Sequence, residues 1–283
     1  MDLPSNPAGP GAPRIGVVGG AGGMGGWLRR FWEGRGCEVR FSDLQTALTN
    51  EELVRWASLT FVSVPLQHTP RVLRELAPLV GTDCALASIA SLMVPSAAAL
   101  IEGTGEALCA HPVFGPTVIA TSGLPVVVAS VRGIRWADWL VGALREAGLE
   151  VQVASPEAHD RTMTIVQSLL HSLYVALCLT MQREGLSPAQ ALPWASPTLQ
   201  LQLGLIARIL GQDPSLYAGL VVGNPLAPAA LDDLAAALQH LAALARAGDE
   251  AAFAEAFLAA RAGFGEHLDP LAAIAEAALG QRS

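Results

Sequence analysis

A run of glycines near the start of the chain has the spacing of a phosphate-binding loop. The run Gly19-Gly20-Ala21-Gly22-Gly23-Met24-Gly25 contains the pattern Gly-x-Gly-x-x-Gly, with an apolar segment before it and a helical pattern after it. Glycines let the backbone approach a pyrophosphate, and the N-terminus of the next helix offers free N–H groups and a partial positive charge. The pattern predicts a dinucleotide site that uses Gly20, Gly22, Gly23, Met24 and Gly25.

Asp43 is the predicted acidic partner of this loop. It lies 18 residues after Gly25, at the end of a second strand-like run, which is the spacing expected for a carboxylate on the adenosine ribose. This carboxylate would accept a hydrogen bond from the ribose 2′-OH and repel a 2′-phosphate, so NAD is favoured over NADP. The alternative is a glycine-rich turn that binds no nucleotide, because a chain with 28 glycines can produce the pattern by chance.

His111 is the candidate acid–base residue. It follows a strand-like run in the segment Ala110-His111-Pro112-Val113-Phe114-Gly115-Pro116. Ligands of open α/β sheets bind at the carboxyl edge of the strands, and an imidazole there can exchange a proton with a substrate hydroxyl near neutral pH. The residues alone leave a second interpretation open, in which this histidine only braces a loop.

The elements that position these residues alternate in the first half of the chain. Helical patterns separate strand-like runs, which predicts parallel strands in a doubly wound sheet. Thr49-Asn50-Glu51-Glu52 fits a capping box, and Thr69-Pro70 fits an N-cap followed by proline. We expect a loose tail over residues 1–13 and a Rossmann-type α/β domain over residues 14–153. The strand-like runs are Ile15–Gly19, Glu38–Phe41, Leu59–Val64, Ala85–Ile89, Ala107–Ala110, Val126–Val131 and Glu150–Val153.

The second half, residues 154–283, is predicted to be entirely helical. Strand signals stop near Ala154, and several Ser-Pro or Asp-Pro pairs then open helical patterns in the manner of an N-cap followed by proline. The helices are apolar over wide faces, which favours burial against a second subunit and therefore a homodimer. The pairs are Ser155-Pro156, Ser187-Pro188, Ser196-Pro197 and Asp213-Pro214, and two later helices are expected over Ala229–Ala247 and Glu250–Ala262.

Composition excludes several classes of function. The 283 residues carry a formal net charge of -8, and all 17 cations are arginine, so lysine Schiff-base chemistry and a P-loop lysine are ruled out. The acidic balance argues against a general nucleic-acid binder. No signal peptide and no clean apolar run of about 18 residues is found, so we expect no membrane segment and a cytoplasmic protein. The four cysteines form no C-x-x-C pair, which predicts buried free thiols and no metal site.

Further segments add to these motifs and together resemble one family, the prephenate dehydrogenases of tyrosine biosynthesis. The resemblance covers roughly residues 14 to 268, and because the remaining ends are short we expect no fused chorismate mutase or regulatory domain. In chain order, the segments are the glycine run, Ser63-Val64-Pro65, Ser91, His111 to Pro116, His159-Asp160 with His171 twelve residues on, Ser196-Pro197 and Gln212-Asp213-Pro214-Ser215-Leu216-Tyr217.

The resemblance implies a Rossmann domain, a helical domain that pairs two subunits, and NAD-dependent oxidation of prephenate with loss of carbon dioxide. His111 matches the catalytic histidine, which accepts a hydrogen bond from the ring hydroxyl as hydride leaves the same carbon, and Ser91 matches the serine that supports it. His159 and His171 match histidines that line the substrate and cofactor cleft, although the apolar surroundings of His171 alone favour a core histidine. Ser63, Val64 and Pro65 are expected at the cofactor.

Two cationic positions of the family pattern are neutral in this chain. Met93 stands where the family commonly has lysine, and Gln200 stands where an arginine clamps a substrate carboxylate; Ser88 also replaces a common aspartate. Losing the arginine removes a charged hydrogen bond of roughly 1.5–3 kcal/mol. Arg161 and Arg208 are candidates to compensate, and the alternative is that both are solvated or structural.

Three hypotheses follow. The first is an NAD-dependent prephenate dehydrogenase acting as a homodimer. The second, motivated by Gln200 and Met93, is a dehydrogenase of the same family that acts on arogenate, an amino-deoxy analogue or another small hydroxy acid. The third is a non-catalytic relative that senses NAD.

Overall fold

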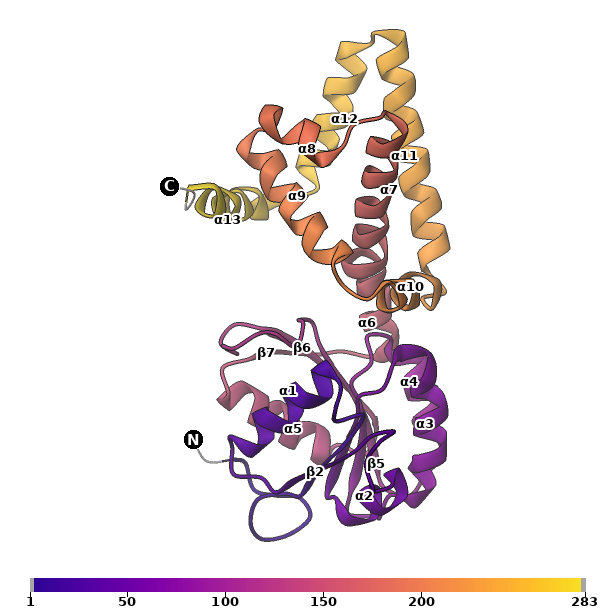
Figure 1. Cartoon of the computed structure of the whole chain (residues 1–283), viewed down its shortest axis with the longest axis vertical. Helices are drawn as coiled ribbons and strands as arrows, with labels where there is room; N and C mark the ends of the chain where they lie inside the picture. The colour runs from indigo at the N-terminus through magenta and orange to yellow at the C-terminus, as the bar shows by residue number, and fades with distance from the viewer. Residues whose placement is uncertain (1–2, 281–283) are drawn as a thin grey trace. The chain divides into compact units, whose positions relative to one another are not determined.

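The structure, a computed structural model, describes residues 3–280 and divides the chain into two compact units (Figure 1). The first, an α/β unit, runs to Thr164 and includes Ala218–Asn224. The second, a helical unit, comprises Ile165–Tyr217 and the chain from Pro225 onward. The α/β unit extends past residue 153, where the strand pattern ends, because the next helix is hydrogen-bonded to this unit through Asp160.

A seven-stranded sheet forms the centre of the α/β unit, in the order β2-β1-β3-β4-β5-β6-β7. Every strand-like run of the sequence overlaps one of these strands, although several bounds differ by one or two residues. The four-residue strands β1, β3 and β4 are buried along their whole length, as expected for central strands covered on both faces. The strands are β1 (Ile15–Val18), β2 (Val39–Ser42), β3 (Leu59–Val62), β4 (Ala85–Ser88), β5 (Glu106–Pro112), β6 (Pro125–Arg132) and β7 (Glu150–Val153).

The direction of the chain across the sheet reverses between β1 and β3. Strand β1 pairs in parallel with β2 on one side and with β3 on the other, with Ile15 opposite both Val39 and Leu59. In open α/β sheets such a switch point leaves a crevice at the carboxyl ends of the strands. The glycine run follows β1 and Ser63-Val64-Pro65 follows β3, so both predicted cofactor segments border this crevice.

Strand β6 corrects the expectation of a fully parallel sheet. It pairs antiparallel with β5, with His111 opposite Val127, and β7 then pairs in parallel with β6. A parallel neighbour requires a crossover, usually a helix, whereas residues 113–124 between β5 and β6 form turns and irregular structure. The chain therefore returns directly beside β5, and the segment after His111 becomes a loop at the carboxyl end of that strand.

Helices cover both faces of the sheet, α1 and α5 on one and α2, α3 and α4 on the other (Figure 1). On the first face Trp32 is fully buried and stacks on Phe61 and Trp139, with ring centroids 5.8 Å and 5.3 Å away. The helices are α1 (Gly23–Glu33), α2 (Asn50–Trp56), α3 (Thr69–Leu76), α4 (Met93–Leu100), α5 (Arg135–Glu146) and α6 (Pro156–Met163), with the short turns η1 (Leu66–His68) and η2 (Ala77–Leu79).

The N-terminal tail is less loose than the sequence predicted. Trp139 donates its indole N–H to the carbonyl of Pro4 at 3.0 Å, and Leu3 packs against the core of the α/β unit. Residues 1 and 2 of the predicted tail lie outside the described residues. Leu3 and Pro4 therefore attach the described start of the chain to the α/β unit.

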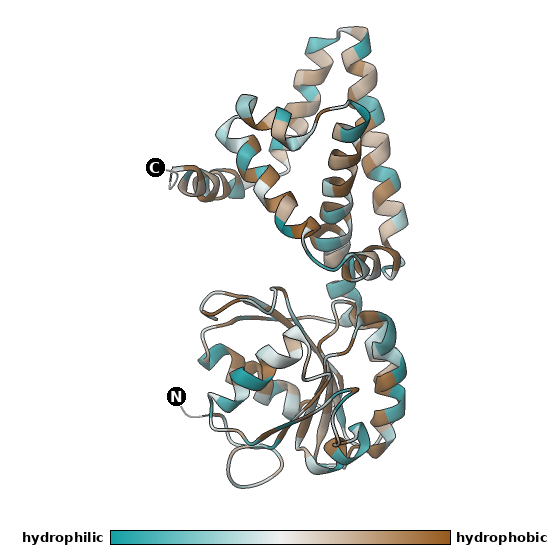
Figure 2. Cartoon of the chain, in the orientation of Figure 1, coloured by the Kyte–Doolittle hydropathy of each residue, from teal (hydrophilic) through white to brown (hydrophobic). Residues whose placement is uncertain are grey.

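The helical unit exposes much of its apolar surface. Helix α7 has no buried residue in the chain described, and Figure 2 shows hydrophobic residues along α7 and α9. Among the exposed side chains are Leu177, Leu205, Phe257 and Ile274. The elements are a π-helical turn η3 (Thr164–Leu169), α7 (Leu170–Arg183), α8 (Pro188–Ala191), η4 (Leu192–Trp194), α9 (Pro197–Leu210), α10 (Pro214–Val222, whose end belongs to the α/β unit), α11 (Ala227–Ala247), α12 (Glu250–Ala262), η5 (Gly265–His267) and α13 (Leu268–Gly280).

One helical run, Pro156–Arg183, has 28 residues with a hydropathy of 1.5 and is long and apolar enough to cross a membrane by length and composition. The sequence predicted no membrane segment, because polar residues such as His171 interrupt its apolar stretches. The run is weak evidence for a span, since helices of soluble proteins pass the same test.

The predicted helix starts are confirmed at four positions. Thr49 and Ser187 form complete capping boxes, and the hydroxyls of Ser155 and Ser196 accept hydrogen bonds from the backbone three residues on. All four cysteines are free thiols; Cys37 and Cys109 are buried, whereas Cys84 and Cys178 are only half-buried.

Candidate active site

The glycine loop is built by close contacts that tolerate no side chain at two positions. A Cβ at Gly20 would lie 2.4 Å from the Cβ of Phe41, and one at Gly25 would lie 2.2 Å from the carbonyl oxygen of Gly19. Gly19 itself has a φ of +79°, a conformation that favours glycine. These glycines are therefore required by the fold, because they let β1, β2 and α1 approach one another.

Gly22 is different, because the space beside it is open. A Cβ at Gly22 would have only the carbonyl oxygen of Gly19 within 4 Å, at 3.4 Å. Gly22 is the N-cap of α1, no side chain caps this helix, and no acidic residue lies in its first turn. The free N–H groups and the helix dipole thus face a surface that a phosphate can approach. The loop fits the pyrophosphate of a dinucleotide.

Asp43 and Ser63 lie beside the same loop. One carboxylate oxygen of Asp43 accepts a hydrogen bond from the backbone N–H of Ala21 at 2.9 Å, so the acidic group lies at the glycine loop. The N–H of Ser63 donates to the carbonyl of Val18 at 2.8 Å, and its own carbonyl borders Gly19. Both predicted cofactor segments therefore meet at the crevice between β1 and β3.

The loop after β5 brings His111 and the glycine loop into one region of the α/β unit. A Cβ at Gly23 would lie 3.0 Å from Pro116, and the ring of Phe114 meets that of Trp27 edge-on with centroids 5.1 Å apart. The segment from His111 to Pro116 thus runs from the end of β5 to the start of α1. This arrangement places the candidate acid–base residue and the candidate phosphate site on the same edge of the sheet.

His111 is hydrogen-bonded to a second histidine, 48 positions away in the sequence. Its Nδ1 lies 2.9 Å from Nε2 of His159, and the two rings meet edge-on. Nδ1 of His159 lies 2.7 Å from a carboxylate oxygen of Asp160. All three side chains are buried, and they form one chain of hydrogen bonds in the α/β unit.

The N-terminus of α4 holds Asp160 in place. One carboxylate oxygen accepts the N–H of Met93 at 2.8 Å, and the other accepts the N–H of Val94 at 2.9 Å. The carboxylate therefore caps α4 across 66 positions of sequence and also meets the helix dipole favourably. The backbone carbonyl of Asp160 accepts from Thr164, whose hydroxyl in turn accepts from Asn224.

Burial makes His111 a neutral imidazole. Desolvation, and next the neighbouring His159, lower the pKa of His111 from 6.5 to about 3, while the charge of Asp160 opposes this shift. An imidazole that is neutral at neutral pH keeps one ring nitrogen as a hydrogen-bond acceptor. His111 can therefore accept a proton or a hydrogen bond from a ligand hydroxyl.

The structure gives His159 and Ser91 different surroundings from those expected. Both ring nitrogens of His159 are already bonded within the protein, so this side chain has no polar atom left for a substrate. Among the hydrogen bonds of residues 3–280, none joins Ser91 to His111, and His159 is the observed partner of the histidine. Ser88 instead donates to Ser96 in the core, and Met93 is fully buried.

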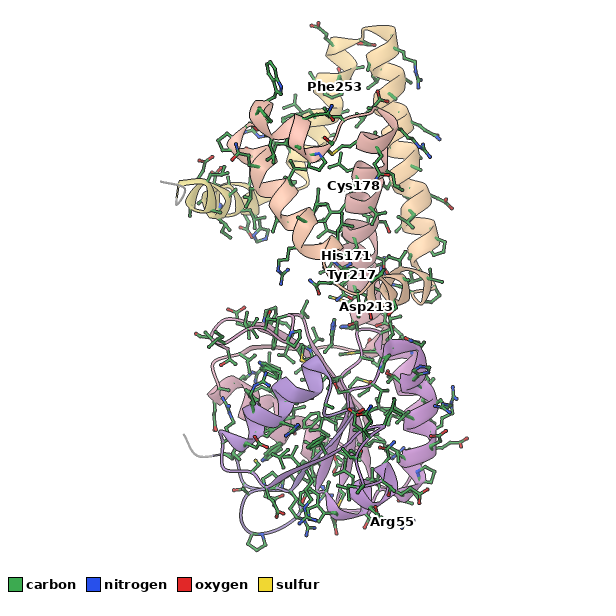
Figure 3. All side chains as sticks on the ribbon, viewed as in Figure 1. Arg55, His171, Cys178, Asp213, Tyr217 and Phe253 are labelled. Carbon is green, nitrogen blue, oxygen red and sulfur yellow. The ribbon has the colours of Figure 1, made fainter. Side chains whose placement is uncertain are left out.

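The remaining predicted substrate residues belong to different units of the chain. Arg161 belongs to the α/β unit and is exposed, whereas His171, Gln200 and Arg208 belong to the helical unit. His171 meets Tyr217 edge-on with centroids 4.8 Å apart, and its Nδ1 is buried without a partner (Figure 3). The amide of Gln200 donates to the carbonyl of Ala195 at 3.1 Å.

Asp160 is the residue that sequence reasoning missed. It lies in the His159-Asp160 motif, in which the sequence assigned a role to the histidine only. The available signal was an aspartate beside a candidate histidine at the start of an apolar helical run, where a charged residue is costly unless paired. Its partners on α4 lie far away in sequence, so only the folded structure reveals why it is there.

Comparison with known proteins gives a consistent result. Residues 155–259 match the family model described as prephenate dehydrogenase, dimerization domain. A probable arogenate/prephenate dehydrogenase of Methanocaldococcus jannaschii is 32% identical over 182 residues, which is 62% of this chain and 41% of that protein. The T-protein of Enterobacter agglomerans is 29% identical over 82% of this chain and 62% of its own length. The chain thus spans less than two thirds of both relatives.

A third curated relative has a different printed substrate. The 4-amino-4-deoxyprephenate dehydrogenase of Streptomyces pristinaespiralis is 27% identical over 75% of this chain and 72% of its own length.

Solved structures share the fold. The Synechocystis arogenate dehydrogenase superposes with a TM-score of 0.69 at 17% identity, covering 90% of this chain and 100% of that one. The prephenate dehydrogenase from A. aeolicus, solved with hydroxyphenyl propionate and NAD+, superposes with a TM-score of 0.68 at 15% identity. The superposition covers 90% of this chain and 98% of that one.

Proposed function

Because the chain belongs to the prephenate dehydrogenase family, we propose that it is an NAD-dependent dehydrogenase that converts prephenate to 4-hydroxyphenylpyruvate, carbon dioxide and NADH. The observation that carries this proposal is the neutral, buried His111 at the same sheet edge as an open glycine loop. The corresponding cellular role is tyrosine biosynthesis in the cytoplasm. Detection of the protein in the cytoplasmic fraction of lysed cells would test this location.

The glycine loop and Asp43 are the residues proposed to hold NAD. The N-terminus of α1 would receive the pyrophosphate at Gly22 and Gly23, and Asp43 would accept a hydrogen bond from the adenosine ribose. Ser63, Val64 and Pro65 border the same crevice after β3. The chemistry that NAD supplies when bound is acceptance of a hydride.

His111 is proposed to act on the ring hydroxyl of the substrate. A neutral imidazole accepts a hydrogen bond from this hydroxyl and so stabilises the carbon from which hydride leaves. The shared proton returns to the oxygen when the ring loses carbon dioxide and becomes aromatic, so the histidine ends the cycle unchanged. Most of the His111 side chain is shielded from water, because the residue is buried.

Gln200, Arg161 and Arg208 are the residues proposed to bind the substrate carboxylates. Gln200 stands at the position of the family's clamping arginine and can donate a neutral hydrogen bond only. Arg208 lies on the same helix, two turns further on, and is exposed. Arg161 and Arg208 are the groups proposed to offset the missing charge, and His171 is proposed to line the substrate site without adding a charge.

The test is NADH formation by the purified protein with NAD and prephenate, with arogenate run in parallel. We expect turnover of prephenate, with most of it lost in H111N while NAD still binds. Normal turnover by H111N would refute the role of this histidine. NAD binding without turnover of either compound would favour a different substrate or an NAD-sensing role.

A second substrate class is tied to Gln200. An amino-substituted analogue such as arogenate or 4-amino-4-deoxyprephenate carries a positive charge that prephenate lacks, so it needs fewer protein cations. The substrate printed for the Streptomyces relative belongs to this class. Including 4-amino-4-deoxyprephenate in the same assay distinguishes the two, because this class predicts faster turnover of an amino compound than of prephenate.

A homodimer is proposed through the helical unit. The matched family model describes a dimerization domain, and the helices expose apolar residues that a second copy would cover. The open groove formed by α11 and α12 is lined by Leu244, Phe253, Phe257 and Leu258. Light scattering after gel filtration should give twice the chain mass of 29.4 kDa. A monomer at micromolar concentration would argue against it.

A further inference from the structure

We propose that His159 and Asp160 are positioning residues that hold His111 in one tautomer, with the proton on Nδ1 and the lone pair on Nε2. The observation is the buried sequence of contacts from Asp160 through His159 to His111, at 2.7 Å and 2.9 Å. This inference rests on the proposed function for its catalytic meaning, but the tautomer itself is a property of the protein alone.

The direction of the hydrogen bonds begins at Asp160. Its two carboxylate oxygens accept the backbone N–H groups of Met93 and Val94, which are donors only. A carboxylate accepts hydrogen bonds and donates none, so in this arrangement Nδ1 of His159 is the donor to Asp160. A neutral His159 protonated at Nδ1 carries its lone pair on Nε2.

The second bond then follows from the first. Nε2 of His159 and Nδ1 of His111 are 2.9 Å apart, and a hydrogen bond at this distance needs one proton between them. In the proposed arrangement His159 is neutral and its Nε2 is the acceptor, so Nδ1 of His111 is the donor. Neutral His111 therefore has no proton on Nε2.

The free nitrogen of His111 is available to a ligand. Nε2 of His111 has no hydrogen-bond partner among the described residues. Nε2 of His111 is also not fully buried. The fully buried side-chain nitrogen and oxygen atoms without a partner in the described chain are Arg29 Nε, Trp32 Nε1, Gln167 Oε1 and His171 Nδ1. Its lone pair consequently remains accessible in an otherwise buried residue.

The same chain can move positive charge away from His111. When Nε2 takes up the hydroxyl proton, the Nδ1 proton of His111 can pass to Nε2 of His159. His111 is then neutral again, and the positive charge rests on His159 beside the carboxylate of Asp160. Reversal of both transfers returns the proton to the substrate oxygen, so no proton is gained or lost.

Nitrogen NMR on protein labelled with ¹⁵N-histidine tests the tautomer without any substrate. We expect Nδ1 of both histidines to have the shift and proton coupling of a protonated ring nitrogen, and Nε2 of both to have the shift of an unprotonated one. The signals of each ring are assigned by their loss in H111N and in H159N. A proton on Nε2 of His111 would overturn the inference, whether or not prephenate is the substrate.

A matched pair of variants tests the consequence for catalysis. In H159N the amide can still donate to Asp160 but does not reach His111, whereas in H159Q the amide oxygen can replace Nε2 as an acceptor. We expect H159N to lose kcat by on the order of 10²-fold, a typical general-base contribution, and H159Q to lose several-fold less. KM and NAD affinity should stay near the wild-type values in both.

Equal losses in the two variants, or losses in KM alone, would contradict a positioning role. D160N adds a third readout, because one amide oxygen can still accept from Met93 and His159 while the negative charge is gone. We expect this variant to keep the tautomer and to lose kcat. An unchanged kcat would refute the transfer of charge to His159. If the wild-type protein turns over no cyclohexadienyl substrate, the proposed function fails while the NMR result still decides the tautomer.

Discussion

Replacing Gly22 with alanine separates the cofactor site from the fold. The new methyl group would have only the carbonyl oxygen of Gly19 near it, at 3.4 Å, which is ordinary van der Waals contact, and the φ of −70° suits alanine. Alanine is a poorer N-cap than glycine but lowers the entropy of the unfolded chain, and these opposing effects are each up to about 1 kcal/mol. The free energy of unfolding should therefore change by less than about 1 kcal/mol.

The effect of G22A on NAD binding should be much larger. The methyl group would occupy the open surface at the N-terminus of α1 that a pyrophosphate must approach. A hydrogen bond to a charged group contributes roughly 1.5–3 kcal/mol. Losing one weakens affinity about ten- to hundredfold, at about 1.4 kcal/mol per decade.

Calorimetric titration with NAD and thermal unfolding provide the two measurements. G204A is the matched control, since a Cβ at Gly204 meets nothing within 4 Å and this residue lies in α9 of the helical unit. G25A is the opposite case, because its Cβ would lie 2.2 Å from a backbone oxygen and should destabilise the fold itself. A folded G22A protein that binds NAD as tightly as wild type would refute the assignment of this crevice to the cofactor.

Three further predictions follow from individual residues. D43A should weaken NAD binding and reduce discrimination against NADP, measured by titration with both; unchanged preference would remove Asp43 from the ribose site. Because the pKa of His111 falls to about 3 on folding, between that pH and about 6.5 the unfolded chain binds a proton that the folded chain does not. The free energy of unfolding should therefore decrease as pH falls below about 6.5, by up to about 1.4 kcal/mol per unit, and urea titrations of H111N should show a shallower slope. Q200R should raise turnover of prephenate about tenfold or more if the missing arginine limits it, whereas no gain would favour a different ligand.

The sequence predicted the local elements well, because local forces decide them. Every strand-like run overlaps a strand of the sheet, the predicted capping box at Thr49 is present, and Ser187 is the N-cap that was predicted. A capping box depends on residues three positions apart, and a buried strand depends on its own apolar side chains. The glycine spacing likewise located the loop between β1 and α1 correctly.

Strand direction and the tail were decided by tertiary structure. Alternation of strands and helices predicted a parallel sheet, but the connection from β5 to β6 has no crossover helix, so β6 pairs antiparallel with β5. The composition of residues 1–13 predicted a loose tail, yet the carbonyl of Pro4 accepts a hydrogen bond from Trp139, which is 135 positions away. The local sequence of β6 does not show that it pairs with β5, and the local sequence of the tail does not show that it contacts Trp139.

The candidate site shows the same division. The residues by themselves singled out His111 and the glycines that a dinucleotide needs, and the family resemblance added His159. Only the folded chain brought the two histidines within 2.9 Å, and only α4 explains Asp160, whose carboxylate caps a helix 66 positions earlier. The physical reason is that hydrogen bonds between distant segments form only after the sheet and its helices have packed, so they leave no periodic signal in the sequence that encodes them.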